Sequence, residues 1–243
     1  MILRKINFKI DINNNEYPFN LEWLRNLKSI EFKSPVTFVV GNNGVGKSTL
    51  LEALAINVNS TNLSQSYYNQ MIEYDSVSRL SDVMRCEWSI KNNKGFFFRA
   101  DDFLNYIRLA IEDSRMPYTF DDGKTPYARD IKHLSHGQAF LAFFNSRLGK
   151  KSLYILDEPE SPLSPQNQLA FMRFMKEAVE QGSQFIIASH SPILLAYPDA
   201  DIISISESKA EGIEYDDIEN VKFMKSFMKD PNRFIYYNFL DEK

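Results

Sequence analysis

Residues 41–48 read Gly41-Asn42-Asn43-Gly44-Val45-Gly46-Lys47-Ser48 and fit G-x-x-x-x-G-K-[ST], the pattern of loops that bind nucleotide phosphates. The context agrees with the pattern. Residues 36–40 (VTFVV) form an apolar run typical of a buried strand, and residues 48–57 (STLLEALAIN) predict a helix. A strand, a glycine loop and a helix in this order place the positive end of the helix dipole at the phosphates. The pattern therefore predicts the phosphate-binding residues Gly41, Asn42, Asn43, Gly44, Val45, Gly46, Lys47, Ser48 and Thr49.

Two side chains of this loop carry charge or metal chemistry. Lys47 is expected to reach the β- and γ-phosphates, and the hydroxyl of Ser48 is expected to bind Mg²⁺. Three of the chain's nine glycines fall within residues 41–46, where a loop must bend tightly and bring its N–H groups against an anion. The alternative is a chance match in a surface loop.

The composition describes an ordinary globular protein. The 243 residues suffice for one large domain, or for a core with a smaller lobe, and 44% of them are hydrophobic. No run of eighteen apolar residues and no charged-then-apolar leader occurs, so we expect a cytoplasmic protein without membrane insertion. Cys86 is the only cysteine, which excludes an intramolecular disulfide and a cysteine-based zinc cluster, and we expect it in a strand of the core. The net charge of −4 does not indicate a nucleic-acid surface.

The first hundred residues predict strands with one solvated face. Apolar residues alternate with polar ones over residues 2–12, as in an antiparallel strand. Residues 84–90 and 96–99 resemble the two strands of a hairpin that turns at 92–95. Residues 101–113 predict a helix, and a loop-like stretch then extends to residue 133.

From residue 136 onward helical and strand-like segments alternate, which predicts a parallel sheet with helices on its faces. One or two further strands and an amphipathic tail follow. The alternating segments are the helix 136–147, the strand 152–157, the helix 165–181, the strand 184–189 and the short helix 191–197.

Two adjacent acids, Asp157 and Glu158, follow the apolar strand 152–156. Ligands of parallel sheets lie beyond the carboxyl ends of the strands, so Asp157 is expected to hold Mg²⁺ directly or through water. Glu158 would then face the γ-phosphate and polarise the attacking water. The alternative is an acidic helix cap or turn.

Two further segments predict contacts with phosphate. In Leu134-Ser135-His136-Gly137-Gln138, a serine cap, a glycine and a helix N-terminus form a second anion-binding end. One nucleotide does not need two such ends from one chain, so we expect this one to serve the nucleotide bound to another copy. His190 follows the strand 185–189 and could hydrogen-bond the γ-phosphate; a structural histidine is the alternative.

The order of these four motifs resembles the ABC-type ATPases, which include transporter motor domains and the SMC- and RecF-like ATPases. The stretches 157–168 (DEPESPLSPQNQ) and 184–197 (QFIIASHSPILLAY) look like the small stand-alone bacterial AAA/ABC-type ATPases. The resemblance implies a dimer with two ATP molecules buried between subunits. It also implies these roles: Lys47 binds phosphate, Ser48 and Asp157 bind Mg²⁺, Glu158 is the catalytic base, His190 senses the γ-phosphate, and Ser135 and Gly137 complete the partner's site.

The chain departs from this family at three places. The signature has His136-Gly137 where a glycine pair is usual, and residues 161–164 (SPLS) replace the loop that crosses the family's dimer. The usual glutamine between glycine loop and signature is not evident, since Gln65 and Gln70 come early in a polar insert. Arg99 and Asp101 are the candidates for that corner.

Two remaining features are open at this stage. Tyr17 and Phe19 are candidates to stack on adenine, with a core or edge aromatic as the alternative. A basic helical face near the C-terminus is either solvated or a patch for DNA or a partner. It comprises Lys222, Lys225, Lys229 and Arg233.

Together these patterns predict an α/β P-loop NTPase with an ABC-ATPase-type core. We expect a mainly parallel central sheet, an N-terminal antiparallel β-region and a small inserted helical lobe, with the core formed by 1–57 and 148–243 and the insert by 58–147. The expected function is Mg²⁺-dependent ATP hydrolysis by an ATP-closed homodimer that acts with a soluble effector protein or DNA. The alternatives are a motor subunit of a membrane ABC transporter and an ATP-gated dimer with negligible turnover.

Overall fold

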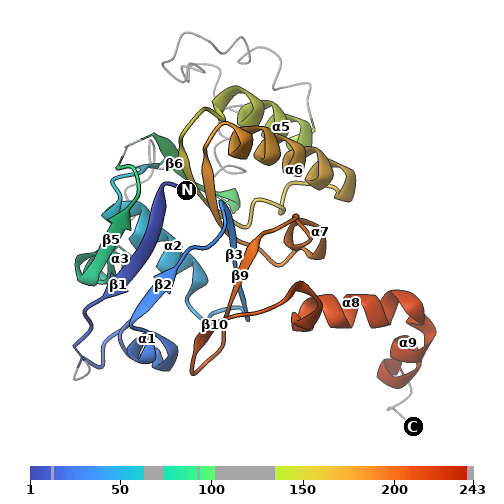
Figure 1. Ribbon diagram of the computed structural model, residues 1–243. Helices are drawn as coiled ribbons and strands as arrows, with labels where there is room; N and C mark the ends of the chain where they lie inside the picture. The colour runs from blue at the N-terminus through green and yellow to red at the C-terminus, as the bar shows by residue number, and fades with distance from the viewer. Residues whose placement is uncertain (12–13, 63–73, 92–93, 102–134, 240–243) are drawn as a thin grey trace, which may run out of the picture.

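The structure is a computed structural model that describes residues 1–11, 14–62, 74–91, 94–101 and 135–239. The expected loop 114–133 lies outside these ranges, as do Gln65, Gln70 and all but the first residue of the helix expected over 101–113. Figure 1 shows the arrangement of the elements.

The described part of the chain is organised around a seven-stranded sheet in which all neighbouring strands run parallel except β10 and β9. Its interior strands are apolar on both faces, which is typical of a sheet covered on both sides. The predicted α/β class with a mainly parallel sheet is confirmed. In sheet order the strands are β10 (Ala210–Gly212), β9 (Asp201–Ile205), β3 (Val36–Gly41), β8 (Gln184–Ala188), β7 (Leu153–Asp157), β6 (Gly95–Arg99) and β4 (Thr61–Asn62).

A second, antiparallel sheet of three described strands contains β1 (Leu3–Phe8) between β2 (Ser29–Glu31) and β5 (Met84–Trp88). The expected N-terminal antiparallel region is therefore present. The buried amide of Gln184, at the start of β8, ties the two sheets together: its Oε1 accepts from the N–H groups of Ile2 and Leu3, both at 2.8 Å.

The expected hairpin over 84–99 is wrong, although both of its strands exist. β5 pairs with β1 in the small sheet, whereas β6 pairs with β7 in the large one. The side chains explain the separation. β5 buries Met84 and exposes its neighbour Arg85, as a strand with one wet face does. In β6, Phe96 and Phe98 pack into the core on one face of the large sheet and Phe97 into the core on the other.

Helices form two layers around the large sheet. Helix α2 (Lys47–Asn57) lies between the two sheets and buries Leu50, Leu51 and Leu54 in a core shared by both. It packs against α3 (Tyr74–Val83), which sequence analysis missed within a polar stretch. Two short helices remain. Helix α1 (Glu22–Asn26) lies between β1 and β2 in the chain, and the 3-10 turn η2 (Tyr215–Asp217) lies between β10 and α8 (Glu219–Lys229).

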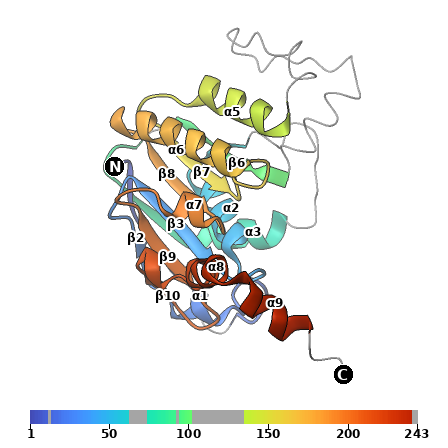
Figure 2. The ribbon, with the colours of Figure 1, turned by 90° about the vertical axis from the view of Figure 1, so that its right-hand side faces the viewer.

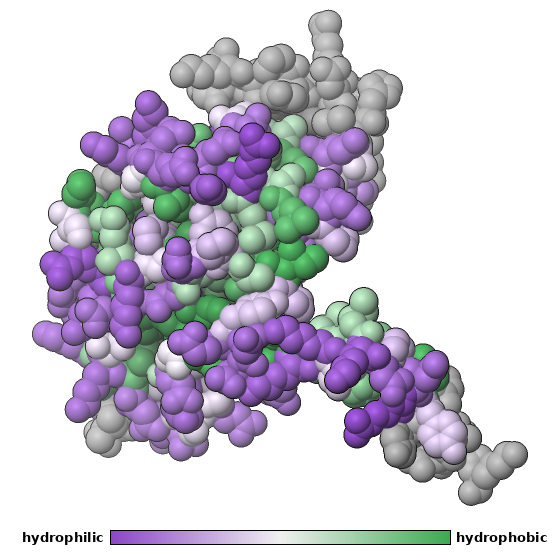
Figure 3. Space-filling view, turned by 45° about the vertical axis from the view of Figure 1, so that its right-hand side comes forward, coloured by the Kyte–Doolittle hydropathy of each residue, from purple (hydrophilic) through white to green (hydrophobic). Residues whose placement is uncertain are grey.

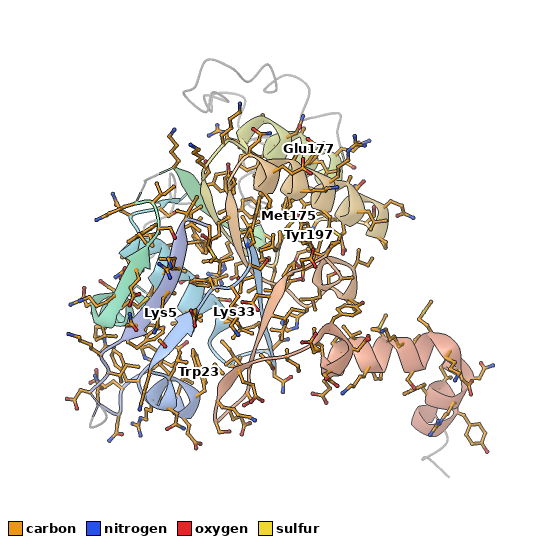
Figure 4. All side chains as sticks on the ribbon, in the orientation of Figure 1. Lys5, Trp23, Lys33, Met175, Glu177 and Tyr197 are labelled. Atoms are coloured by element: carbon orange, nitrogen blue, oxygen red, sulfur yellow. The ribbon has the colours of Figure 1, made fainter. Side chains whose placement is uncertain are left out.

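The opposite face is covered by α5 (His136–Arg147), α6 (Pro165–Glu180) and α7 (Pro192–Leu195). Helices α5 and α6 lie side by side (Figure 2). Figure 4 labels two residues on α6: Met175 is fully buried against the sheet, and Glu177 is exposed. These helices and the flanking strands match the expected 136–147, 152–157, 165–181, 184–189 and 191–197 to within two residues.

The chain ends in an arm formed by α8 (Glu219–Lys229) and α9 (Pro231–Phe239), which projects from the rounded body (Figures 1 and 3). The rings of Phe223, Phe227 and Phe234 pack against one another and join the two helices. No helix in the described ranges combines the length and apolarity that crossing a membrane requires.

The division into a core (1–57 and 148–243) and an inserted lobe (58–147) stays a prediction. Within the described ranges, β6 is a strand of the large sheet and α5 belongs to the helical layer over it. Both lie inside the segment assigned to the insert.

Candidate functional site

The strands β3, β8 and β7 are neighbours and parallel, so their carboxyl ends meet at one edge of the large sheet. Residues predicted from three separate motifs follow these ends. The glycine loop continues from β3, Asp157 ends β7 and Glu158 follows it, and His190 comes two residues after β8. In the register, Ala188 on β8 lies opposite both Asp157 and Val39.

The glycine loop needs its glycines for conformation and space. Gly44 and Gly46 have φ of 79° and 102°, in the left-handed region that favours glycine. A Cβ on Gly46 would lie 2.9 Å from Cδ1 of Leu21. Trp23 of α1, labelled in Figure 4, supports the loop from the same side: its indole Nε1 donates to the carbonyl of Val45 at 2.8 Å. Sequence analysis missed Trp23, because its supporting role depends on a contact 22 residues away.

Lys47 lies within the curve of this loop. Its Nζ donates to the carbonyls of Gly41 at 2.8 Å and Asn42 at 3.0 Å. Burial lowers the pKa of Lys47, while the carboxylates of Glu158 and Asp157 act in the opposite direction. The ammonium is therefore anchored at the loop and faces the acids that end β7.

Asp157 is a buried carboxylate suited to a cation. The residue is 3% exposed, and its Oδ1 has no hydrogen-bond partner within the described ranges. Burial raises its pKa, whereas a hydrogen bond from the side chain of Ser48 and the charge of Arg99 lower it. A buried acid with an unpartnered oxygen beside a serine hydroxyl fits Mg²⁺, which takes hard oxygen ligands.

Arg99, one of the two candidates for the corner between glycine loop and signature, lies beside Asp157. Its Nη1 donates to Oε1 of Glu52 on α2 at 2.8 Å, and its Nε lies 3.9 Å from Oδ2 of Asp157. Asp101, the other candidate, is exposed. The parallel register that pairs Arg99 with Asp157 thus brings a cation next to the acid at the end of β7.

Glu158 and His190 approach each other across the ends of β7 and β8. Oε1 of Glu158 lies 3.9 Å from Nε2 of His190, and the two side chains are 47% and 36% exposed. Glu158 has φ of 49°, an uncommon conformation for a residue with a side chain. Burial and the charge of Lys47 lower the pKa of His190 from its ordinary value, and the charge of Glu158 opposes them, so the net effect favours the neutral imidazole.

Glu160 is an acid of this edge that sequence analysis missed. Its Oε1 accepts hydrogen bonds from Ser189 Oγ at 2.8 Å, His190 N at 2.7 Å and Ser191 N at 3.2 Å. Burial raises its pKa, and the bonds from His190 and Ser189 oppose that effect. The sequence shows an acid at this position but not the loop that it binds, which comes thirty residues later.

The serine cap of α5 has the expected form. Ser135 Oγ accepts from the N–H of Gln138 at 3.3 Å, and Oε1 of Gln138 accepts from the N–H of Ser135 at 3.0 Å. Contacts within the same chain favour glycine at position 137. A Cβ there would lie 2.8 Å from Nδ2 of Asn167 and 3.0 Å from the carbonyl oxygen of Pro162. No hydrogen bond or ion pair joins Ser135 or Gly137 to the strand ends within the described part of one chain, so their role toward a nucleotide stays a proposal about a second copy.

The two aromatic candidates differ in exposure. Phe19 is 4% exposed and belongs to the core, as the alternative interpretation had it. Tyr17 is 42% exposed, and its hydroxyl is hydrogen-bonded to the hydroxyl of Thr49 in the first turn of α2. Tyr17 is thus the aromatic candidate that remains at the glycine loop.

Two lysines of the basic face on α8 have acidic partners, with Lys222 bonded to Asp217 and Lys225 to Asp216. These ion pairs favour a solvated surface over a free cationic patch. Cys86 lies in β5 as expected, but it is only partly buried. Its Sγ donates to Oδ1 of Asn57 at 3.1 Å, and burial raises its pKa to about 11.

Comparison with known proteins places this chain in a family. Residues 19–210 match the model described as the RecF/RecN/SMC N terminal domain, which covers well over half of the chain. The chain belongs to this family. The resemblance to the ABC-type ATPase superfamily is thereby confirmed.

Individual relatives share about a quarter to a third of their aligned residues with this chain. The chain is 26% identical over 210 residues to the energy-coupling factor transporter ATP-binding protein EcfA2 of Methanospirillum hungatei, an alignment that covers 79% of this chain and 50% of the relative. It is 30% identical over 149 residues to the subtilin transport ATP-binding protein SpaT of Bacillus subtilis, covering 52% and 24%. The chain thus spans a half and a quarter of the length of these two relatives.

Among solved structures, the SmcHead bound to the C-winged helix domain of ScpA has a TM-score of 0.50 at 16% identity. The superposition covers 87% of this chain and 96% of that one. At this identity the likeness concerns the fold alone, and it agrees with the α/β class described above.

Proposed function

We propose that this protein binds ATP together with Mg²⁺ and hydrolyses it to ADP and phosphate. The observation that carries the proposal is the meeting of Lys47, Asp157, Glu158 and His190 at the carboxyl ends of three adjacent parallel strands. Ligands of open α/β sheets bind at this edge. The membership in the RecF/RecN/SMC family and the ATP-binding relatives support the same function.

The residues present fit both the nucleotide and the metal. The backbone N–H groups of the glycine loop and the ammonium of Lys47 would hold the phosphates. Ser48 and Asp157 would hold the ion, because a hydroxyl and a buried carboxylate supply the oxygen ligands that Mg²⁺ requires. Tyr17, exposed beside Thr49, would contact the adenine base.

The chain's own groups divide the chemistry between charge and proton transfer. When bound, Mg²⁺ neutralises charge that develops on the phosphates. Lys47 adds a second positive charge at the loop. Glu158 is half exposed, so its carboxylate can accept the proton of the attacking water. The neutral imidazole of His190, 3.9 Å from Glu158, can hold the γ-phosphate or the water by a hydrogen bond.

Phosphate release tests this function. The purified protein should release phosphate from ATP with Mg²⁺ and stop when EDTA is added. Lys47→Ala should lose activity because the phosphates lose their fixed cation. Lys33→Ala is the matched control, since Lys33 is exposed and its hydrogen bond to Asp201 comes from the backbone N–H, which the substitution keeps. Equal rates for Lys47→Ala and the parent would contradict the assignment.

The proposal includes a second copy of the chain. Ser135 is exposed at the N-terminus of α5 and can present that helix end to the nucleotide bound by a partner. Light scattering of the Glu158→Gln variant should then show about twice the 28.3 kDa of one chain when ATP and Mg²⁺ are present. Ser135→Arg, which places a long side chain at that end, should stay at the mass of one chain. If the Glu158→Gln variant also stays at the mass of one chain with ATP and Mg²⁺, the site shared between two copies is overturned.

A second candidate function is the ATP-binding subunit of a membrane transporter. The names of the relatives EcfA2 and SpaT favour it. The other candidate is a cytoplasmic ATPase that acts on DNA or with a soluble effector protein, and the description of the matched family names no transporter. Two measurements separate these candidates. Stimulation of phosphate release by double-stranded DNA supports the ATPase that acts on DNA, and co-purification with a membrane permease supports the transporter subunit. A protein that dimerises with ATP yet releases no phosphate would instead be an ATP-gated dimer.

A further inference from the structure

Both backbone polar groups of His190 are held by side chains from distant parts of the chain. Its N–H donates to Oε1 of Glu160 at 2.7 Å, and its carbonyl accepts from Nδ2 of Asn220, also at 2.7 Å. Glu160 comes from the loop after β7, and Asn220 from the first turn of α8. These two bonds fix the backbone of His190 and with it the direction of the Cα–Cβ bond, so the ring can lie only where the rotamers about χ1 and χ2 place it.

Glu160 joins the loops after β7 and β8 into one unit. A single carboxylate oxygen accepts three hydrogen bonds from Ser189, His190 and Ser191, and charge-assisted bonds of this kind are stronger than neutral ones. The backbone adds a fourth link, because the N–H of Glu158 donates to the carbonyl of Ala188 at 3.0 Å. The loop that contains Glu158 and the loop that contains His190 are therefore joined by hydrogen bonds.

Asn220 connects the same loop to the C-terminal arm. Its side-chain amide reaches the carbonyl of His190 from α8, and the hydroxyl of Tyr215 donates to the carbonyl of Pro192 at 2.9 Å. Asn220 is exposed and contributes nothing to the core. Its hydrogen bond to His190 is thus the described contact of this side chain with the loop after β8, and the core does not require it.

We propose that Glu160 and Asn220 are positioning residues that hold the imidazole of His190 toward Glu158. The proposal rests on the function proposed above and adds two residues to which the sequence analysis assigns no role. The distance of 3.9 Å between Nε2 of His190 and Oε1 of Glu158 depends on the orientation of a half-exposed side chain. A backbone held at both its donor and its acceptor keeps the Cα–Cβ bond of His190 in place, so that a rotamer of the ring reaches Glu158.

The first test needs no nucleotide. The chain has three histidines, so the Cε1–H signals of the imidazoles form a short NMR spectrum, in which His190→Ala identifies one. Asn220→Asp keeps the size of the side chain but removes the donor to the His190 carbonyl. The His190 signal should shift or broaden in this variant, while the signal of His136 stays in place as an internal control. Glu219→Gln, at the neighbouring exposed position, should leave both signals unchanged.

The second test uses steady-state hydrolysis. Loss of one such hydrogen bond should lower kcat roughly three- to tenfold in Asn220→Asp with little change in KM. Glu160→Leu removes the acceptor and should lower kcat further, and Glu160→Gln, which keeps an acceptor oxygen, should restore part of the loss. Thermal unfolding identifies a Glu160 variant that fails to fold, and Asn220→Asp then decides the question alone.

A double-mutant cycle with His190→Ala distinguishes positioning from a general structural effect. Asn220→Asp should cause no further loss in the His190→Ala background, because it acts through the missing imidazole. An undiminished effect in that background, or an unmoved His190 signal, would overturn the inference while the parent still hydrolyses ATP. A parent without hydrolysis would instead contradict the proposed function, and the NMR result would still decide the positioning.

Discussion

Glu158→Gln should separate activity from stability, because the structure gives this side chain little to do in the fold. The change replaces a carboxylate by an amide of the same shape. The described contact that it loses is the approach of Oε1 to His190 Nε2 at 3.9 Å between two side chains that are 47% and 36% exposed. Exposed ion pairs contribute about 0–1 kcal/mol, and a neutral imidazole at pH 7 contributes less. In a chain of this size, 1 kcal/mol shifts the Tm by about 2–4 °C.

The effect on hydrolysis should be far larger. A general base contributes a factor of ~10²–10⁴, which corresponds to about 2.7–5.4 kcal/mol of activation free energy. Single-turnover phosphate release measures this loss, and thermal unfolding measures the stability of the same preparations. Glu177→Gln, exposed on α6, is the control that should change neither. A variant that keeps the parental rate refutes the base assignment. A variant whose Tm falls by ten degrees or more refutes the reasoning about its contacts.

Three further predictions follow from buried groups. Burial raises the pKa of Asp157, so its ionised form destabilises the nucleotide-free protein above that pKa. Asp157→Asn should therefore raise the Tm at pH 7.5, and this gain in Tm should vanish as the pH falls below about 4. A lower Tm for the variant at pH 7.5 would contradict this. With a pKa of about 11, the thiol of Cys86 should react with iodoacetamide at pH 8 roughly a hundredfold more slowly than an unperturbed cysteine, and mass spectrometry of the native protein checks this against the urea-unfolded chain. Gly137→Ala forces a methyl group to 2.8 Å from Asn167 Nδ2, which costs about 1–3 kcal/mol and should lower the Tm without nucleotide. Adding Asn167→Ala should recover part of that loss. An unchanged Tm for Gly137→Ala would contradict the predicted clash.

The sequence predicts the elements around the glycine loop well, because local patterns and the fold agree there. A glycine loop needs a strand before it and a helix after it, and β3 and α2 lie within one residue of the expected limits. The same holds for the strands that lead to Asp157 and His190, since each is an apolar run bounded by polar residues. Parallel pairing then gathers their ends at one edge.

Other features depend on pairing between distant segments, which local patterns do not contain. The strands β5 and β6 are close in sequence and resemble a hairpin, but they belong to different sheets because one has a wet face and the other is buried on both faces. Glu160 and Asn220 were missed for the same reason: each binds a loop about thirty residues away. The sequence predicts Gly137 for close approach to a partner's nucleotide, but it does not show that Asn167 and Pro162 of the same chain lie where a Cβ would be.

The central claim is that the glycine loop and the acid that ends β7 form one binding site for ATP with Mg²⁺. Calorimetric titration of ATP into Glu158→Gln tests it most directly, because that variant should bind the nucleotide without consuming it. The account predicts about one ATP per chain with Mg²⁺, much weaker binding in EDTA, and no saturable heat when Lys47→Ala is also present. Saturable binding that survives Lys47→Ala unchanged, or no binding at all to Glu158→Gln, would contradict it.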